Sequence, residues 1–202
     1  MQEIISFIRE KQPVNKAIVA ANIIVFLILS IMGDTQDAWF MVNHGACYAP
    51  FVIEYQEYYR LFTCMFLHFG VEHLFYNMLL LIFLGDTLEK TVGKLRYLII
   101  YLLGGLAGNI VSIWAGLRGE DYAVSAGASG AIFAVIGALI WIVFKNKGRL
   151  EGYSTQRLLL MAGLSVINGL METGIDNWAH IGGLAGGFLL AVLLYRKKRL
   201  EA

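Results

Sequence analysis

The chain has 202 residues, of which 58% are hydrophobic and only 15% are charged, and its formal net charge is +1. An ordinary soluble domain carries about 25% charged residues, so apolar runs that cross a bilayer explain the deficit better than a large soluble core does. The small net charge gives no global field that would attract nucleic acid, and we expect no nucleic-acid partner.

Six apolar segments follow one another along the chain and predict an all-α bundle of six membrane-spanning helices. Their approximate ranges are 14–33, 68–88, 95–117, 123–144, 155–172 and 177–195. The first resembles a signal peptide because basic residues precede it, but no small-residue cleavage site follows, so we interpret it as a membrane helix. No linker separates the segments, which predicts a single domain over residues 1–202.

Basic residues predict the orientation of these spans. With the N-terminus placed in the cytoplasm, fourteen of the sixteen Lys and Arg residues fall in cytoplasmic segments, and only Arg60 and Arg118 fall outside. Because cytoplasmic loops are enriched in basic residues, this asymmetry predicts an even number of spans with both termini in the cytoplasm.

The long first outer loop, residues 34–60, is rich in aromatic side chains. They are Trp39, Phe40, Tyr48, Phe51, Tyr55, Tyr58 and Tyr59. Such rings favour the headgroup region, so we expect the loop to lie partly in the outer interface; the alternative is a small soluble cap. Cys47 and Cys64 fall on the same side and could pair, but two free thiols are the preferred interpretation.

Four polar side chains inside the predicted spans stand out, because such groups are costly in a membrane and are usually functional. His73 and Asn77 lie in the second span, Ser129 in the fourth and His180 in the sixth. Ser129, His180 and His73 lie 16, 16 and 17 residues from the first cytoplasmic basic residue of their spans. At 1.5 Å per residue, these distances place all three at one level, about 24–26 Å from the cytoplasmic charges.

A hydroxyl, two imidazoles and a carboxamide at one depth form a set suited to acyl transfer. His180 can take the proton that makes Ser129 a nucleophile. His73, Asn77 and the backbone N–H of Ser129 can donate hydrogen bonds to the oxyanion that follows. Each signal alone is weak, since a single membrane Ser, His or Asn usually serves packing.

Small residues surround both proposed reacting groups and would let two helices approach closely. Gly130 follows Ser129, while Gly183 and Gly187 lie at +3 and +7 from His180, on its face of the helix. This small-residue spacing supports contact between the fourth and sixth spans, although plain helix packing explains it equally well.

Taken together, these residues resemble the rhomboid protease family over about residues 57–190. The matching patterns are Gly127-Ala128-Ser129-Gly130, Ala179-His180-Ile181-Gly182-Gly183, the spacing of His68, His73 and Asn77, and Gly85 through Glu89.

The resemblance implies a Ser129–His180 catalytic pair, an oxyanion hole that includes His73, Asn77 and backbone amides, and packing of Phe133 against the histidine ring. It also implies cleavage of membrane-anchored proteins near the outer end of their transmembrane helix. We therefore expect membrane-protein substrates, no cofactor and no metal. We also expect a bacterial plasma membrane location, with a site that opens to the outer side.

The sequence departs from the family at Glu57-x-Tyr59-Arg60, where a Trp-Arg pair is common; Arg60 is expected to form a structural ion pair or cap. Asp176, one turn before His180, could orient the imidazole, but a solvated loop acid is the preferred interpretation. Two other functions stay open. One is an inactive relative that binds membrane proteins, although both Ser129 and His180 are present; the other is a small transporter, which would spread polar residues through the membrane depth.

Overall fold

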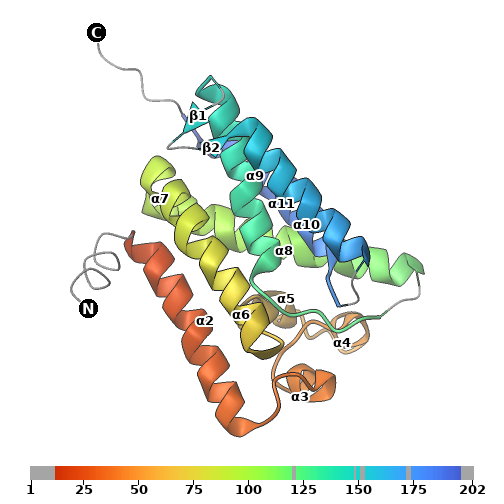
Figure 1. The fold of residues 1–202 in the computed structure, drawn as a ribbon. Coiled ribbons are helices and arrows are strands. Elements are labelled where there is room, and N and C mark those ends of the chain that lie inside the picture. Colours follow the sequence, from red (N-terminus) through yellow and green to blue (C-terminus); the bar gives the residue numbers. More distant parts are fainter. Residues whose placement is uncertain (1–11, 120–121, 148, 151–152, 172–173, 197–202) are drawn as a thin grey trace, which may run out of the picture. The chain divides into compact units, whose positions relative to one another are not determined.

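The computed structural model describes residues 12–119, 122–147, 149–150, 153–171 and 174–196, and these are almost entirely helical (Figure 1). The helices are α2 (Pro13–Met32), α3 (Ala38–Asn43), α4 (Ala49–Ile53), α5 (Arg60–Thr63), α6 (Gly70–Leu80), α7 (Asp86–Val92), α8 (Lys94–Gly119), α9 (Ser129–Lys145), α10 (Thr155–Met171) and α11 (Asn177–Leu194). A 3₁₀ turn (Cys64–Phe66) follows α5, and a π-helical turn (Leu81–Gly85) joins α6 to α7. The short strands β1 (Arg149–Leu150) and β2 (Tyr153–Ser154) pair antiparallel.

Four helical segments within the described residues are long and apolar enough to cross a membrane. They are Pro13–Met32, Gly70–Val92, Lys94–Gly119 and Asn177–Leu194. Two further apolar helical segments, Ser129–Lys145 and Thr155–Ile167, are shorter. All six correspond to predicted spans, and the end that we predicted at residue 172 lies outside the described residues.

The start of the fourth predicted span was wrong. We expected a helix from residue 123, but α9 begins at Ser129, and the preceding residues are largely extended. Ser125 and Cys47 exchange backbone hydrogen bonds in an antiparallel bridge, and the Gly127 N–H donates to the Cys64 carbonyl at 2.9 Å. Because these backbone groups are bonded to distant residues, they cannot also form a helical ladder.

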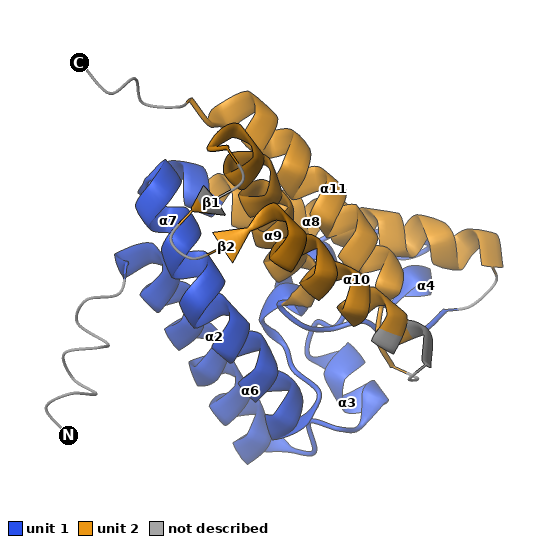
Figure 2. Cartoon of the chain, turned by 45° about the horizontal axis from the view of Figure 1, so that its top comes forward, with its two compact units in different colours: residues 1–98, 122–128 blue, residues 99–121, 129–202 orange. Residues whose placement is uncertain are grey.

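The chain divides into two compact units, which Figure 2 colours separately. The first contains residues 1–98 and 122–128, and the second contains residues 99–121 and 129–202. The prediction of a single domain stays a prediction.

Carboxylates from α7 cap the start of α2 in the first unit. Glu89 is buried and accepts hydrogen bonds from the backbone N–H groups of Val14 (3.1 Å) and Asn15 (2.7 Å). Asp86 accepts a third from Gln12 at 2.7 Å. The first N–H groups of a helix have no partner within the helix, and negative charge there is favourable, so this cap fixes α2 against α7.

The first loop also belongs to the first unit and is organised around Arg60. The guanidinium is buried, donates to the carbonyls of Val42 and Ala46, and forms an ion pair with Glu57. The predicted structural ion pair is therefore confirmed. Both cysteines are buried and free, as preferred. Trp39, Tyr55, Tyr58 and Tyr59 are exposed, and their place in the outer interface stays a prediction.

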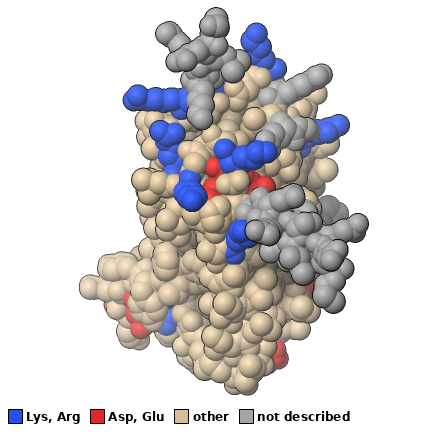
Figure 3. Space-filling view, turned by 90° about the vertical axis from the view of Figure 1, so that its left-hand side faces the viewer, with Lys and Arg blue, Asp and Glu red and all other residues tan. Residues whose placement is uncertain are grey.

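Most of the molecular face drawn in Figure 3 carries neither acidic nor basic side chains, and the charged ones are confined to limited areas of it. A surface so poor in charge would be unusual for a soluble protein, whose exterior is rich in charged side chains. Large apolar side chains are also exposed along α2, among them Ile24, Leu27 and Ile31. These features suit a surface that faces lipid.

Candidate functional site

Ser129 is the first residue of α9, so its side chain lies at the N-terminal end of that helix. The residue is half-buried, whereas most of α9 is fully buried. Gly127, two residues earlier, has a φ of +143°, a backbone conformation that L side chains rarely adopt. Glycine at this position therefore lets the chain pass from the extended segment into the helix.

His180 lies in the first turns of α11 and is 6% exposed. The ring of Phe133, one turn after Ser129, stacks on the imidazole with centroids 4.1 Å apart and planes inclined by 7°. The packing that the family resemblance implied for Phe133 is therefore present. A flat ring against one face of the imidazole restricts its rotation, which is useful if a ring nitrogen has to meet a hydroxyl.

Glycines bring α9 and α11 into backbone contact. A Cβ on Gly183 would overlap the carbonyl of Gly130, and a Cβ on Gly187 would overlap the carbonyl of Ala134. A Cβ on Gly130 would lie 3.6 Å from the Ala179 carbonyl oxygen. The backbones of Gly130 and Gly183 thus approach closely, and the N-terminal turns of the two helices pack together.

Asp176 caps α11 and joins it to α8. Its carboxylate accepts a hydrogen bond from the Ala179 N–H at 2.9 Å and another from the Ser112 hydroxyl. The residue is half-buried, which corrects the preferred interpretation of a solvated loop acid. Sequence analysis missed both the cap and Ser112, although an Asp directly before an apolar helix is a usual cap signature.

The two predicted oxyanion donors lie together on α6 in the first unit. His73 is half-buried, and its ring centroid lies 5.2 Å from that of His68. Asn77 is buried, and its Nδ2 donates to the His73 carbonyl at 3.0 Å. A side-chain amide has two N–H bonds, and the bond to the His73 carbonyl uses only one of them.

The segment before the nucleophile candidate is fixed within the first unit. In addition to its bonds with Cys47 and Cys64, it bonds His68, whose Nε2 accepts from the Ala128 N–H at 3.4 Å. His68 is 1% exposed. The backbone directly preceding Ser129 is therefore held by several hydrogen bonds.

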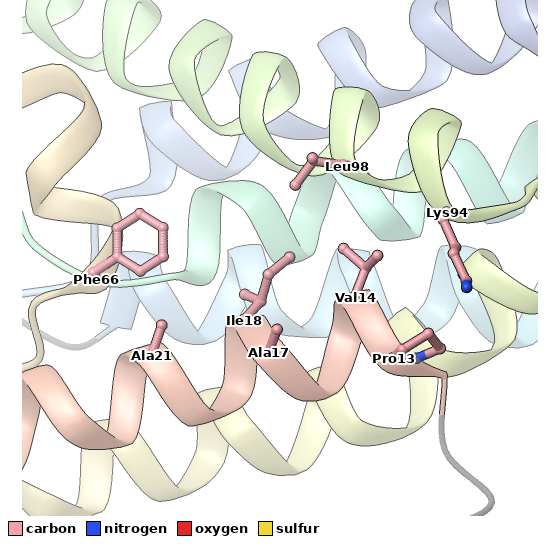
Figure 4. A pocket seen from close by; sticks show the side chains of 8 residues that line it. All are labelled: Pro13, Val14, Ala17, Ile18, Ala21, Phe66, Lys94 and Leu98. Carbon is pink, nitrogen blue, oxygen red and sulfur yellow. The ribbon is translucent and has the colours of Figure 1, made fainter.

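A separate open groove of about 520 Å³ lies in the first unit between α2 and the start of α8 (Figure 4). Its lining is apolar except for Lys94 at one end, and among the described residues none of our site candidates contributes to it. The groove is therefore separate from the candidate catalytic and oxyanion-hole residues described above.

Comparison of the sequence with known proteins assigns this chain to a family. The Rhomboid domain matches residues 55–197. Rhomboid protease GluP of Bacillus subtilis is 33% identical over 176 residues, which are 87% of this chain and 34% of GluP. RHOMBOID-like protein 7 and RHOMBOID-like protein 1 of Arabidopsis thaliana are 40% and 36% identical over 74% and 72% of this chain, respectively.

This chain spans 47% of the length of RHOMBOID-like protein 7 and 37% of RHOMBOID-like protein 1. The matched region contains all four polar residues singled out above, together with the helices that carry them. Because the match extends over well more than half of an all-helical chain with several apolar helices, this chain belongs to the rhomboid family of intramembrane proteases and is a multi-pass membrane protein.

Proposed function

We propose that this protein is a serine endopeptidase that cleaves membrane-anchored proteins near the outer end of their transmembrane helix. Ser129 is the nucleophile and His180 is its general base. The observation that carries the proposal is the packing of the first turns of α9 and α11, where Phe133 stacks on His180 and Gly130 lies against Ala179.

The proposed reaction has two halves. The Ser129 Oγ attacks the scissile carbonyl carbon while its proton passes to an imidazole nitrogen of His180. The tetrahedral intermediate then collapses, the C–N bond breaks, and the imidazolium returns the proton to the leaving amine. In the second half, water attacks the acyl-enzyme with His180 again as base, which releases the carboxylic acid and regenerates the hydroxyl.

The oxyanion needs preorganised donors, and we propose the amide of Asn77, the ring of His73 and the backbone N–H of Ser129. The matched depth of these residues in the sequence and the resemblance of the motif support this part of the proposal. The position of Ser129 at the start of α9 adds support, since the first N–H groups of a helix have no helical acceptor.

In this proposal both termini lie in the cytoplasm and the site opens to the outer side of a bacterial plasma membrane. The concentration of basic residues in the predicted cytoplasmic segments supports the orientation.

Cleavage of a single-span substrate in detergent tests the proposal. We expect Ser129→Ala and His180→Ala each to reduce cleavage to background, while Ser165→Ala, which changes a serine on α10, retains activity. Substantial cleavage by Ser129→Ala or His180→Ala would contradict the assignment. Inactivity of the unaltered protein against a panel of such substrates, with normal binding, would favour the inactive-relative alternative.

A further inference from the structure

The helix that carries the proposed oxyanion donors is not a regular α-helix. It runs from Gly70 to Val92, and the π-helical turn Leu81–Gly85 interrupts it. The turn lies between Asn77 and Glu89, so it separates the part that carries His73 and Asn77 from the part that is anchored to α2. π-Turns inside α-helices are rare and often accompany functional sites.

Two buried polar side chains hold this turn. The side-chain amide of Asn15, on α2, donates from Nδ2 to the Leu81 carbonyl at 2.9 Å. The Tyr97 hydroxyl donates to Oδ1 of the same amide at 2.6 Å. Asn15 is 1% exposed and Tyr97 is fully buried. The amide therefore occupies a carbonyl of the π-turn and is itself oriented by a phenol.

Gly85 provides the space for this arrangement. A Cβ on Gly85 would overlap Oδ1 of Asn15 and would lie 2.7 Å from the Tyr97 hydroxyl oxygen. The residue belongs to the Gly85-to-Glu89 pattern, to which sequence analysis assigned no role. Its hydrogen side chain allows Asn15 and Tyr97 to reach the turn.

The π-turn changes the direction in which Asn77 points relative to Glu89. Twelve residues separate the two, and in an uninterrupted α-helix, at about 100° per residue, their side chains would point about 120° apart. One π-bulge absorbs one residue, which leaves them about 20° apart. Both side chains are indeed buried, at 5% and 1% exposure, so both face inward from the same helix.

We propose that Asn15 is a positioning residue: by holding the π-turn, with Tyr97, it sets the rotation of α6 that aims His73 and Asn77. This inference rests on the proposed function of those two residues. The Glu89 carboxylate fixes the C-terminal part of the helix, α7, to the start of α2, and the Asn15 side chain fixes the π-turn that precedes α7. Loss of the Asn15 amide removes the partner of the Leu81 carbonyl and favours the ordinary α-helical register.

A double-mutant cycle separates positioning from a general contribution to stability. We would measure kcat and KM on one single-span substrate for the unaltered protein and for three variants: Asn15→Leu, Asn77→Ala and the double variant. We expect Asn15→Leu to lower kcat about 10-fold with little change in KM, because misaligned donors lose transition-state stabilisation. In the Asn77→Ala background the same change should lower kcat by clearly less than in the unaltered protein, since two changes that act partly through one interaction are not additive and only the effect through His73 remains.

Asn22→Leu is the matched control. Asn22 is buried on the same helix, but its amide Nδ2 donates to Ile18 of its own helix at 2.8 Å. We expect its kcat to stay within about twofold of the unaltered value, since it makes no bond to the π-turn. If Asn15→Leu does not fold, Tyr97→Phe replaces it in the cycle, because this change removes only the hydroxyl that orients the amide.

Additive effects of Asn15→Leu and Asn77→Ala, or an unchanged kcat in Asn15→Leu, would overturn the inference. The proposed function is tested separately by Ser129→Ala in the same assay. Cleavage that survives Ser129→Ala refutes the function, whereas Ser129-dependent cleavage with an additive cycle refutes only the positioning role of Asn15.

Discussion

Within the first unit and within the second unit, neighbouring segments are held together by different kinds of contact. In the first unit, buried polar side chains bond the backbone of neighbouring segments: Glu89 bonds the start of α2, Asn15 bonds the π-turn, and Arg60 bonds two carbonyls of the first loop. In the second unit, glycines of α9 and α11 bring two backbones together, as at Gly183 and Gly187.

The two units should therefore tolerate different substitutions. Lipid is as apolar as the helix surface, so the hydrophobic effect does little to hold spans together, and hydrogen bonds or close packing have to do so. A unit joined by polar bonds is sensitive to the loss of a partner. A unit joined by backbone contact is sensitive to added volume. Substitutions at Gly187, Glu89 and Asp176 test this contrast.

Gly187→Ala should have the largest effect. The added methyl would overlap the Ala134 carbonyl, a backbone atom that cannot move aside, and overpacking of this kind costs about 3 kcal/mol. We expect a much lower midpoint of thermal unfolding in detergent and little cleavage.

The same substitution at Gly163 is the control, because a Cβ there would meet no atom within 4 Å. Gly163→Ala, on α10, should leave stability unchanged or raise it by up to about 1 kcal/mol, since Ala is the better helix former. Equal destabilisation by both changes would contradict the account of the second unit.

Glu89→Gln should have an intermediate effect in the first unit. The carboxylate accepts from two backbone N–H groups through its two oxygens, and a glutamine offers only one acceptor. A buried N–H left without a partner costs about 1–3 kcal/mol. Thermal unfolding measures this loss, and an unchanged midpoint would show that the cap of α2 contributes nothing.

Asp176 should give the smallest effects and distinguishes capping from catalysis. Asp176→Asn keeps an oxygen that can accept from the Ala179 N–H, so stability and rate should change little. Asp176→Ala loses the cap and should cost about 1 kcal/mol. A fall of several orders of magnitude in kcat for Asp176→Asn, with normal unfolding, would instead favour a Ser-His-Asp triad.

Hydropathy predicted the helical class and the approximate place of each apolar helix because the signal is local and strong. The start of α9 was wrong for the opposite reason. Residues 123–128 are mostly small or apolar and look like part of a span, and their extended form depends on bonds to Cys47, Cys64 and His68. Partners 60 or more residues away cannot be read from a local pattern.

The candidate site residues could be predicted where a polar side chain stood out within an apolar segment. Ser129, His73, Asn77 and His180 are polar groups within apolar runs, and the family patterns add their roles. Asn15 carried the same signal, a polar residue at the start of an apolar run, but it was not singled out. The sequence of the π-turn, Leu-Ile-Phe-Leu-Gly, does not reveal that its Leu81 carbonyl is bonded by the Asn15 amide of another helix.

Labelling by a fluorophosphonate probe tests the Ser129–His180 pair itself, because the probe reports on the nucleophile and its base and requires no choice of substrate. The account predicts that mass spectrometry finds the probe on Ser129 and that His180→Ala abolishes the labelling while the protein remains folded. Labelling of another serine, or equal labelling of Ser129 without His180, would contradict a Ser129–His180 pair.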